Sequence, residues 1–437
     1  NPLAFIRKYD ELFNRLLFLL GALVVYRFGS HVPIPGMDPE SLSKFFQTNE
    51  NTILGLFNMF SGGALERMSV MALGIMPYIS ASIIVQMMTA VIPSLDALKK
   101  EGQAGQRQIN KYTRQLTLAL ALVQSIGMCT GLISQNLTLT SGLGFYIPAV
   151  TSLVAGSMFL MWLGEQITER GIGNGISMLI LAGIVATFPQ VVTQSINSVQ
   201  QGQMNMIALL IFSLLALAVV AGIVFIERAQ RRIPVNYAQK QSQERKIYAQ
   251  QQSHLPLKIN MAGVIPAIFA SSLLLFPASL GQWVGQSPNP NIFQSFLQNM
   301  ALVLSPGQPL YLVIFAALII FFCYFYTALV FSPKEVSENL KRSGAYIPGI
   351  RPGLQTQRYL DHVLNRLTFI GAIYMTIICL MPMILQSAFG IPFHLGGTSV
   401  LISVVVIMDF IAQVKAHLMT HQYHDYSLIQ TMEVKHS

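Results

Sequence analysis

The sequence predicts an all-α polytopic membrane protein with ten transmembrane helices. Of its 437 residues, 53% are hydrophobic and only 10% are charged, and the mean hydropathy is +0.53. Soluble globular chains carry about 25% charged residues, so this composition excludes an ordinary soluble protein. Two further observations support the class: the apolar residues gather in runs long enough to cross a bilayer, and the positive charge lies between alternate runs.

The apolar runs define ten candidate spans, each of which would form a helix because about 20 apolar residues cross the hydrocarbon core. The first and fifth are short, which is typical of helices that border a cavity but is also compatible with local bilayer thinning or tilt. In order, the spans are Leu16 to Gly29, Ser69 to Ile92, Leu116 to Ile133, Tyr146 to Gly164, Ile176 to Val192, Met206 to Ile226, Ile259 to Leu280, Leu310 to Phe331, Leu367 to Leu385, and Ser399 to Leu418.

A short apolar segment, Ile53 to Leu65, precedes the second span and is separated from it by the polar residues ERMS. A helix of this length would cover roughly 20 Å, whereas the hydrocarbon core is about 30 Å thick. The segment must therefore enter the membrane and return. Such a re-entrant segment is tolerated only where protein or a water-filled cavity surrounds it, so we expect a cavity within the helical bundle.

The distribution of basic residues predicts the orientation of the spans. Of the 27 Lys and Arg residues, 24 lie on one side, in the N-terminal segment, the even-numbered loops and the tail. The positive-inside rule places that side, with both termini, in the cytosol. The two long basic loops, at about 227–258 and 332–366, then face the cytosol too.

An even split gives an N-terminal half at 1–200 and a C-terminal half at 201–437, each with five spans. Because five is odd, the two halves would have inverted topologies. The sequence carries no self-similarity strong enough to establish this repeat by itself.

Residues that could support catalysis or ion coupling are sparse in the spans. Cys129, Cys323 and Cys379 all lie in apolar runs, and the His residues lie mostly in loops, at span ends or in the tail. Asp409 is the only acid well inside an apolar run, and it is equally compatible with a position near the interface. We therefore expect no enzyme activity, metal site or cofactor.

Two glycine-rich stretches, GIGNG at Gly171 to Gly175 and IPGIRPG at Ile347 to Gly353, invite comparison with nucleotide-binding loops. Neither follows a predicted strand in a βαβ unit, so tight turns are the better interpretation. In the second stretch, two prolines stiffen the backbone on either side of Arg351. An exposed arginine there would suit docking to a carboxylate or phosphate.

Polar side chains inside the second, third and seventh spans form another candidate site. They are Gln86, Gln124, Ser271 and Ser272. An amide without a partner is costly in hydrocarbon, so these residues could be interhelical hydrogen-bonding groups. They could equally mark a seam between helices that is weak enough to open.

Several strings, in order along the chain, identify a family. FNMFSGGAL, ALGIMPYISAS, FLMWLGEQITERGIGNGIS, SHLPLKINMAGVIPAIFASS, FFCYFYTALVFSP, GAYIPGIRPG and FGIPFHLGGTS resemble the SecY family, the central subunits of bacterial protein-translocation channels. The resemblance runs from about Arg15 to Tyr423 and is proteobacterial in style. It does not extend to the tail from His424 onward.

This resemblance implies an hourglass of two inverted halves with a plug, a constriction and a lateral gate. The plug would fall on the re-entrant segment at 53–65, the gate on the second, third, seventh and eighth spans, and cytosolic partners would dock on the basic loops. The implied plug residues are Asn58, Phe60, Ser61, Gly62, Gly63 and Arg67; the pore ring is Ile75, Ile79, Ile176, Ile180, Ile268 and Ile402; the gate residues are Gln86, Gln124, Ser271 and Ser272; and the docking residues are Arg245, Lys246 and Arg351.

The position of Ile176 rests on the resemblance alone. Its place in the sequence puts it near the cytosolic boundary, so the GIGNG turn would have to dip inward to bring it to the ring.

The implied function is a channel that translocates unfolded secretory proteins across the bacterial inner membrane and releases membrane segments sideways into lipid. An apolar ring suits this task because it closes by excluding water and does not read any particular sequence. The implied partners are the SecE and SecG membrane subunits, the SecA motor ATPase, translating ribosomes, signal peptides, unfolded preproteins and lipid. A secondary transporter or a passive scaffold are the competing interpretations.

Overall fold

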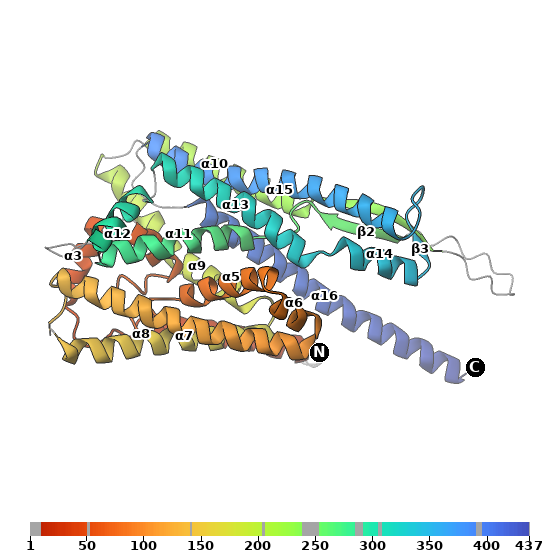
Figure 1. Ribbon diagram of the computed structural model, residues 1–437, viewed down its shortest axis with the longest axis horizontal. Coiled ribbons are helices and arrows are strands. Elements are labelled where there is room, and N and C mark those ends of the chain that lie inside the picture. Colours follow the sequence, from red (N-terminus) through yellow and green to blue (C-terminus); the bar gives the residue numbers. More distant parts are fainter. Residues whose placement is uncertain are drawn as a thin grey trace.

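The computed structural model describes residues 10–49, 53–139, 142–202, 206–237, 253–284, 292–304, 308–389 and 396–436. It is predominantly helical, with one small sheet (Figure 1). The helices of the N-terminal part are α2 (Asp10–Gly29), α3 (Pro39–Asn49), α4 (Ile53–Phe60), α5 (Met76–Val91), α6 (Pro93–Lys100), α7 (Gln103–Ser134), α8 (Leu143–Arg170) and α9 (Gly175–Gln200). Those of the C-terminal part are α10 (Met206–Arg228), α11 (Ile265–Val284), α12 (Ile292–Val303), α13 (Pro309–Val330), α14 (Pro333–Arg342), α15 (Leu354–Phe389) and α16 (Gly397–His436).

The predicted membrane-protein fold is confirmed. Within the described ranges, eight helices are long and apolar enough to cross a membrane: α2, α7, α8, α9, α10, α13, α15 and α16. The bent pair α5–α6 and the apolar helix α11 coincide with the two remaining predicted spans. The structure thus provides one helix for each of the ten apolar runs.

The second predicted span, Ser69 to Ile92, differs from the structure because its first seven residues form turns and α5 begins only at Met76. Gly74 has a φ of +59°, which a right-handed helix cannot contain, so α5 begins only after it, with Pro77 in its first turn. Pro93 stops α5 at the other end, where the chain bends by 99° into α6. α5 is therefore shorter than the apolar run that predicted it.

Other helices are longer than predicted. α7 has 32 residues and α15 has 36, and both continue through polar sequence beyond the predicted spans. Hydropathy locates the part of a helix that is apolar, but polar residues with good helix propensity extend it into water. The basic loop predicted at 332–366 is accordingly reduced to α14, a short strand and a turn.

The basic loops also form a sheet that the hydropathy pattern did not indicate. Its strands are β1 (Gln230–Tyr237), β2 (Ser253–Lys258) and β3 (Ala345–Tyr346), in the antiparallel order β2-β1-β3. Ile233 and Leu257 face inward and pack with Leu360 of α15 in a small separate core. The alternation that builds this core is only a few residues long and is interrupted by charges and prolines, so it is easily missed.

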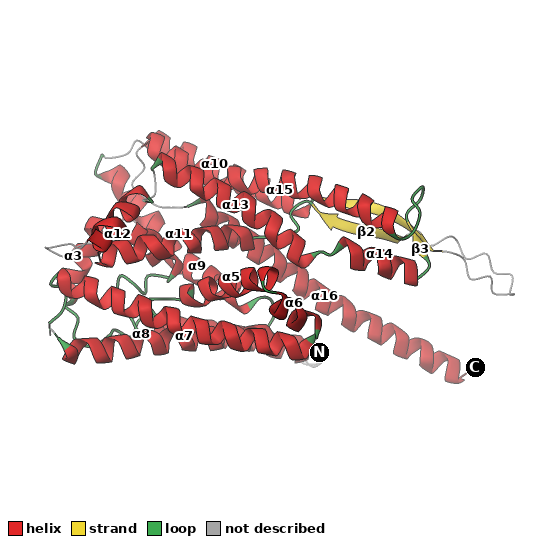
Figure 2. Ribbon diagram, viewed as in Figure 1, coloured by secondary structure: helices red, strands yellow, loops and turns green. Residues whose placement is uncertain are grey.

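The helices pack as two neighbouring groups. Figure 1 shows α7 and α8 along one side of the bundle and α10, α13 and α15 along the other. α11 packs against α5 and α7, and α16 packs against α9, so these helices join the two groups. Figure 2 shows the sheet beyond one end of the bundle, next to α14 and at the end toward which α16 extends. The sheet, α14 and the extended part of α16 therefore lie at the same end of the bundle.

Candidate functional site

The short helix α4 is buried within the bundle. It packs against α9 and α11, and the Ser399 hydroxyl at the start of α16 lies 3.5 Å from the Met59 sulfur. Leu54, Phe57 and Met59 are buried in the main hydrophobic core. Eight helical residues cover only about 12 Å, so α4 is a re-entrant element and not a span.

The helical part of the predicted plug ends at Phe60, whereas the prediction extended it to Leu65. Gly62 and Gly63 have φ values of +69° and +80°, a conformation that stops the helix and that glycine adopts without strain. The chain then folds back in turns. The Asn58 side chain fixes this return, because its Oδ1 accepts a hydrogen bond from the Glu66 backbone N–H at 2.9 Å.

Helix α2 holds the turn after α4 through two side chains. The buried Tyr26 hydroxyl donates to the Ser61 carbonyl at 3.1 Å, and Arg27 Nη1 donates to the Gly62 carbonyl at 2.9 Å. Arg67 lies close to Gly63, with a buried Nη1 that has no hydrogen-bond partner. The turn is thus attached to α2 by hydrogen bonds from side chains. These bonds can break while the backbone hydrogen bonds of α2 stay intact.

The six isoleucines of the predicted ring all belong to the main hydrophobic core. Ile75, Ile79, Ile180, Ile268 and Ile402 are buried, and Ile176 is half-buried against the same core. Ile75 and Ile176 come together at Gly164 of α8: Ile176 Cγ1 and Ile75 Cδ1 lie 3.4 and 3.6 Å from the position a Cβ on Gly164 would occupy. Ile176 thus packs beside Ile75, and the role of both in a ring stays a prediction.

The GIGNG turn explains how Ile176 reaches this position. The Asn174 side chain caps α9 by accepting from the Ile176 backbone N–H at 3.1 Å, and Gly173 has a φ of +90°. The Thr168 hydroxyl also accepts from the Gly175 backbone N–H at 2.9 Å. These bonds turn the chain tightly from α8 into α9. The prediction of a turn is confirmed, although the capping role of Asn174 was not recognised in the sequence.

The four predicted gate residues lie on α5, α7 and α11, which pack together. Gln86 donates to Ser82 on its own helix at 3.1 Å, and Ser271 donates to the Ile268 carbonyl at 2.9 Å. Ser272 is the one that reaches another helix, with its hydroxyl 3.9 Å from the Met76 sulfur of α5. The buried Oε1 of Gln124 has no partner. For these described side chains, a weak seam fits better than a strong interhelical network.

Of the predicted docking residues, Arg351 is exposed in the turn between β3 and α15. Its backbone carbonyl accepts from the Thr356 hydroxyl at 2.9 Å, and Gly349 and Gly353 have φ values of +80° and +102°. The backbone of the turn is thus fixed while the guanidinium faces solvent. Arg245 and Lys246 lie outside the described residues.

The sequence did not identify several residues that complete the site. Tyr26 was treated only as part of a span, and Arg27 was counted only as a charge. Gly183 of α9, whose backbone lies against the turn after α4, was not singled out. Arg114 of α7 forms two hydrogen bonds with Glu165 of α8, at 3.0 and 2.7 Å. Nothing in a single sequence pairs residues so far apart; only the presence of Arg27 in an apolar run could have drawn attention to it.

Comparison with known proteins identifies the family. The model of the SecY family matches residues 69–411. The chain belongs to the SecY family. It is 62% identical over 414 residues to the protein translocase subunit SecY of Pseudomonas aeruginosa, which covers 95% of this chain and 92% of that protein. It is 56% identical over 417 residues to the SecY of Escherichia coli K12, covering 94% and 93%.

Solved structures with the same fold include protein-conducting channels. One, described as the structure of a protein conducting channel, aligns with a TM-score of 0.62 at 17% identity over 94% of this chain and 93% of that chain. Another, from work on how the SecY plug domain stabilises the closed channel, gives 0.65 at 16% identity over the same shares. Sec61 in a canine ribosome-channel complex gives 0.59 at 16% identity, again over the same shares.

Proposed function

We propose that this SecY-family chain is the protein-conducting channel of a bacterial protein translocase. In this function, unfolded secretory proteins pass through the centre of the bundle and apolar segments leave sideways into lipid. The observation that carries the proposal is the position of α4, a helix too short to span that is buried in contact with α9, α11 and the start of α16. A movable element there would open a continuous path.

The isoleucine ring supplies the second part of the mechanism. In the absence of substrate, the six side chains exclude water from the constriction, and an apolar opening without water does not conduct ions. During transport, the same side chains would contact whatever polypeptide enters. Because isoleucine offers no hydrogen bonds or charges, the ring would not distinguish one sequence from another.

The seam between α5, α7 and α11 would act as the lateral gate. Its described polar side chains bond mostly within their own helices, so separating the helices breaks few strong contacts. A signal sequence has an apolar core of about 7–15 residues. Moving this core from water toward lipid lowers the free energy. That differential binding is what a ligand must supply to favour the open state.

We infer the energy source and the partners from the basic loops, which we place in the cytosol. Basic loops with an exposed Arg351 suit an acidic surface of a motor or the phosphates of ribosomal RNA. We assign these roles to SecA and to the translating ribosome, and Arg245, Lys246 and Arg351 to docking. SecE and SecG would complete the membrane complex. The location proposed is the inner membrane, with both termini cytosolic and no catalytic or cofactor site in this chain.

Single-channel recording on the purified complex in planar bilayers tests this function. The full chain is compared with a variant that lacks residues 53–65, and the deletion is expected to give large, weakly ion-selective currents where the full chain is closed. A secondary transporter would give no such currents, and a passive scaffold would conduct in neither form. Silent recordings from an inserted and assembled deletion variant would exclude the proposal.

A further inference from the structure

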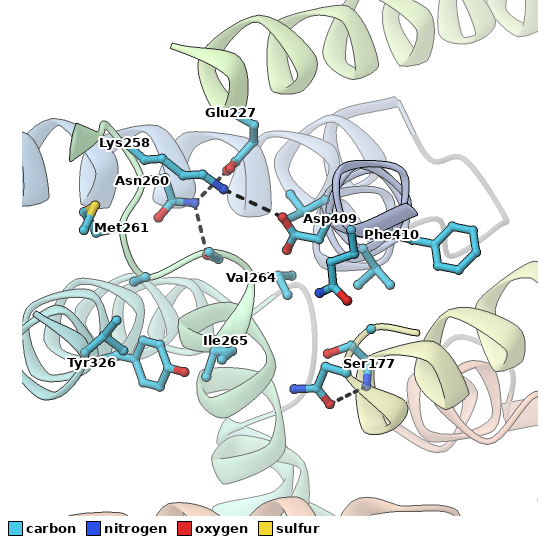
Figure 3. Close-up of a pocket in the computed structure, with 18 of the residues that line it drawn as sticks. Ser177, Glu227, Lys258, Asn260, Met261, Val264, Ile265, Tyr326, Asp409 and Phe410 are labelled. Atoms are coloured by element: carbon cyan, nitrogen blue, oxygen red, sulfur yellow. Dashed lines mark hydrogen bonds and ion pairs between the residues drawn. The ribbon is translucent and has the colours of Figure 1, made fainter. Parts of the chain in front are cut away.

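The connector between the sheet and the gate helix is a short irregular segment, residues 259–264. It joins the end of β2 at Lys258 to the start of α11 at Ile265. The connector borders a cavity of about 240 Å³, whose lining also includes residues of α9, α10, α13 and α16 (Figure 3). A segment without regular backbone bonding must be held by other groups if it is to have one conformation.

The Asn260 side chain holds the connector. Its Nδ2 donates to Glu227 Oε1 at the end of α10, at 2.6 Å, and to the Gly263 carbonyl at 3.0 Å (Figure 3). The same nitrogen lies 3.6 Å from the Met375 sulfur of α15. Asn260 is 4% exposed and Glu227 is 9% exposed. One buried amide therefore joins α10, the connector and α15.

The backbone of the connector leaves little room for adjustment. Gly371 of α15 faces it so closely that a Cβ there would lie 3.0 Å from the Ile259 carbonyl oxygen. The Ile259 N–H donates to the Ala229 carbonyl at 3.3 Å, which fixes the connector to the start of β1. Gly263 then turns the chain with a φ of +62°. The connector is thus bonded at both ends and packed along its side.

The first turn of α11 follows directly from this segment. The Val264 carbonyl accepts from the backbone N–H groups of Ala267 and Ile268, at 3.1 and 3.3 Å. Val264 is next to the Gly263 carbonyl that Asn260 bonds. Ile268, a residue of the isoleucine ring, is therefore only one helical turn away from the fixed connector.

We propose that Asn260 is a positioning residue that makes the cytosolic sheet and α11 move as one body. A partner that docks on the basic loops would then displace the gate helix and Ile268 through the connector. Without the Asn260 bonds, the partner would still bind, but the displacement would be absorbed in residues 259–264. This inference rests on the proposed channel function, because it assigns the route by which docking reaches the gate.

The neighbouring ion pair provides a matched control. Lys258 Nζ lies 3.8 Å from Asp409 Oδ1 of α16, and the two side chains are 58% and 54% exposed. Such an exposed and long pair contributes little, since water screens it. The buried Asn260–Glu227 bond is different, because removing the donor leaves a buried carboxyl group without that partner.

The test measures the geometry between the sheet and the gate helix in the complete complex. Spin labels are attached at Tyr237→Cys in β1 and Leu273→Cys in α11, two exposed positions, and the distance distribution is measured by pulsed electron resonance. With Asn260 intact we expect one narrow distribution. Asn260→Leu should broaden it at least twofold, and Lys258→Met should leave it unchanged. An equally narrow distribution in Asn260→Leu would overturn the proposal.

A second label pair separates loss of position from loss of fold. Val123→Cys in α7 and Ile147→Cys in α8 are exposed and lie in the N-terminal group of helices. This distance should be the same in every variant. If Asn260→Leu disturbs it, the hydrogen bond is tested from its other side with Asn260 intact: Glu227→Leu removes the acceptor and should broaden the distance between the sheet and α11, whereas Glu227→Gln keeps an acceptor oxygen and should leave it narrow. An equally narrow distribution in Glu227→Leu would overturn the proposal.

The consequence for transport is measured separately. In proteoliposomes driven by the motor, Asn260→Leu should lower the maximal export rate about threefold or more while the motor concentration for half-maximal export stays the same. A defect in docking would instead raise that concentration. Because the label distances need no transport, they would still decide the positioning role if the chain exported nothing and the channel function itself were wrong.

Discussion

The backbone of Gly183 in α9 lies directly against the backbone of Gly62 in the turn that follows α4. A Cβ on Gly62 would lie 3.0 Å from the Gly183 Cα, and a Cβ on Gly183 would lie 2.8 Å from the Phe60 carbonyl oxygen. Real Cβ atoms essentially never show the shorter of these separations. The two glycines therefore allow α4 and its turn to seat against a spanning helix without side chains between them.

This contact predicts that Gly183→Val displaces the plug. The added side chain cannot fit between α9 and the turn, so the closed seat is lost while the remainder of α9 is unaffected. Resting ion leak through reconstituted complexes should rise several-fold, and preproteins with defective signals should be exported. Gly21→Val is the control, because a Cβ at Gly21 meets no atom within 4 Å. A tight channel in Gly183→Val would show that the seat does not close the pore.

Replacing Ile79, Ile180 and Ile402 together by Ser tests the ring. All three are buried in the main core, and hydroxyl groups there would bind water that isoleucine excludes. Resting conductance should increase in the full-length chain with its plug in place. The comparison is Ile223→Ser in α10, a buried isoleucine outside the proposed ring. If the two variants leak equally, the ring is not the barrier.

The spans were predictable from the sequence because hydropathy reports the environment of a helix directly. The turns at the centre were less so. The segment from Ser61 to Ile75 is apolar apart from the residues ERMS, and positive φ values at Gly62, Gly63, Met68 and Gly74 break it into turns. A glycine in an apolar run is also compatible with close helix packing, as at Gly183, so its conformation is not determined by the sequence alone.

Some site residues could likewise be named from the sequence, whereas others could not. The ring and gate positions could be named because the resemblance carries them residue by residue, whereas their partners could not. The Tyr26 bond to the Ser61 carbonyl joins residues 35 positions apart, and the Asn260 bond to Glu227 spans 33. Such contacts depend on how the helices pack, which periodicity along one chain does not encode.

Gln124→Leu is expected to hold the lateral gate closed. The Gln124 Oε1 is buried without a hydrogen-bond partner, which costs about 1 kcal/mol or more in the closed state. Leucine removes that cost. A stabilisation of about 1 kcal/mol lowers the open fraction roughly fivefold.

Export of a preprotein with a weak signal measures this effect. It should fall more than export of one with a strong signal, which supplies more free energy for opening. Leu122→Gln, at an exposed position of the same helix, controls for altered insertion. Unchanged or increased export of the weak substrate in Gln124→Leu would contradict the prediction.

Arg351→Glu should block motor-driven export without affecting folding. The side chain is exposed, and the turn is fixed by the backbone bond from Thr356, so reversing the charge changes the surface and not the structure. Charge reversal at an interface lowers association strongly. Export by inverted vesicles is the measurement, with Arg358→Glu as a nearby charge reversal. Normal export by the Arg351 variant would remove it from the docking site.

The Arg114–Glu165 pair is expected to hold the N-terminal half of α7 against α8. The guanidinium donates from both Nε and Nη2, and Glu165 is only 18% exposed, so this pair is better ordered than an ordinary surface pair. Because Arg114 is half exposed, we expect a contribution of about 1 kcal/mol or less to the stability of the folded complex.

Arg114→Glu should lower the thermal unfolding midpoint of the purified complex by a few degrees, because two carboxylates would then face each other. Exchanging both residues should recover most of the loss, and 1 M KCl should reduce the difference. The exposed Lys100–Asp96 pair on α6 is the matched control, and its reversal should have almost no effect. If the exchanged pair is as unstable as Arg114→Glu alone, the two side chains do not stabilise the helix pair through their charges.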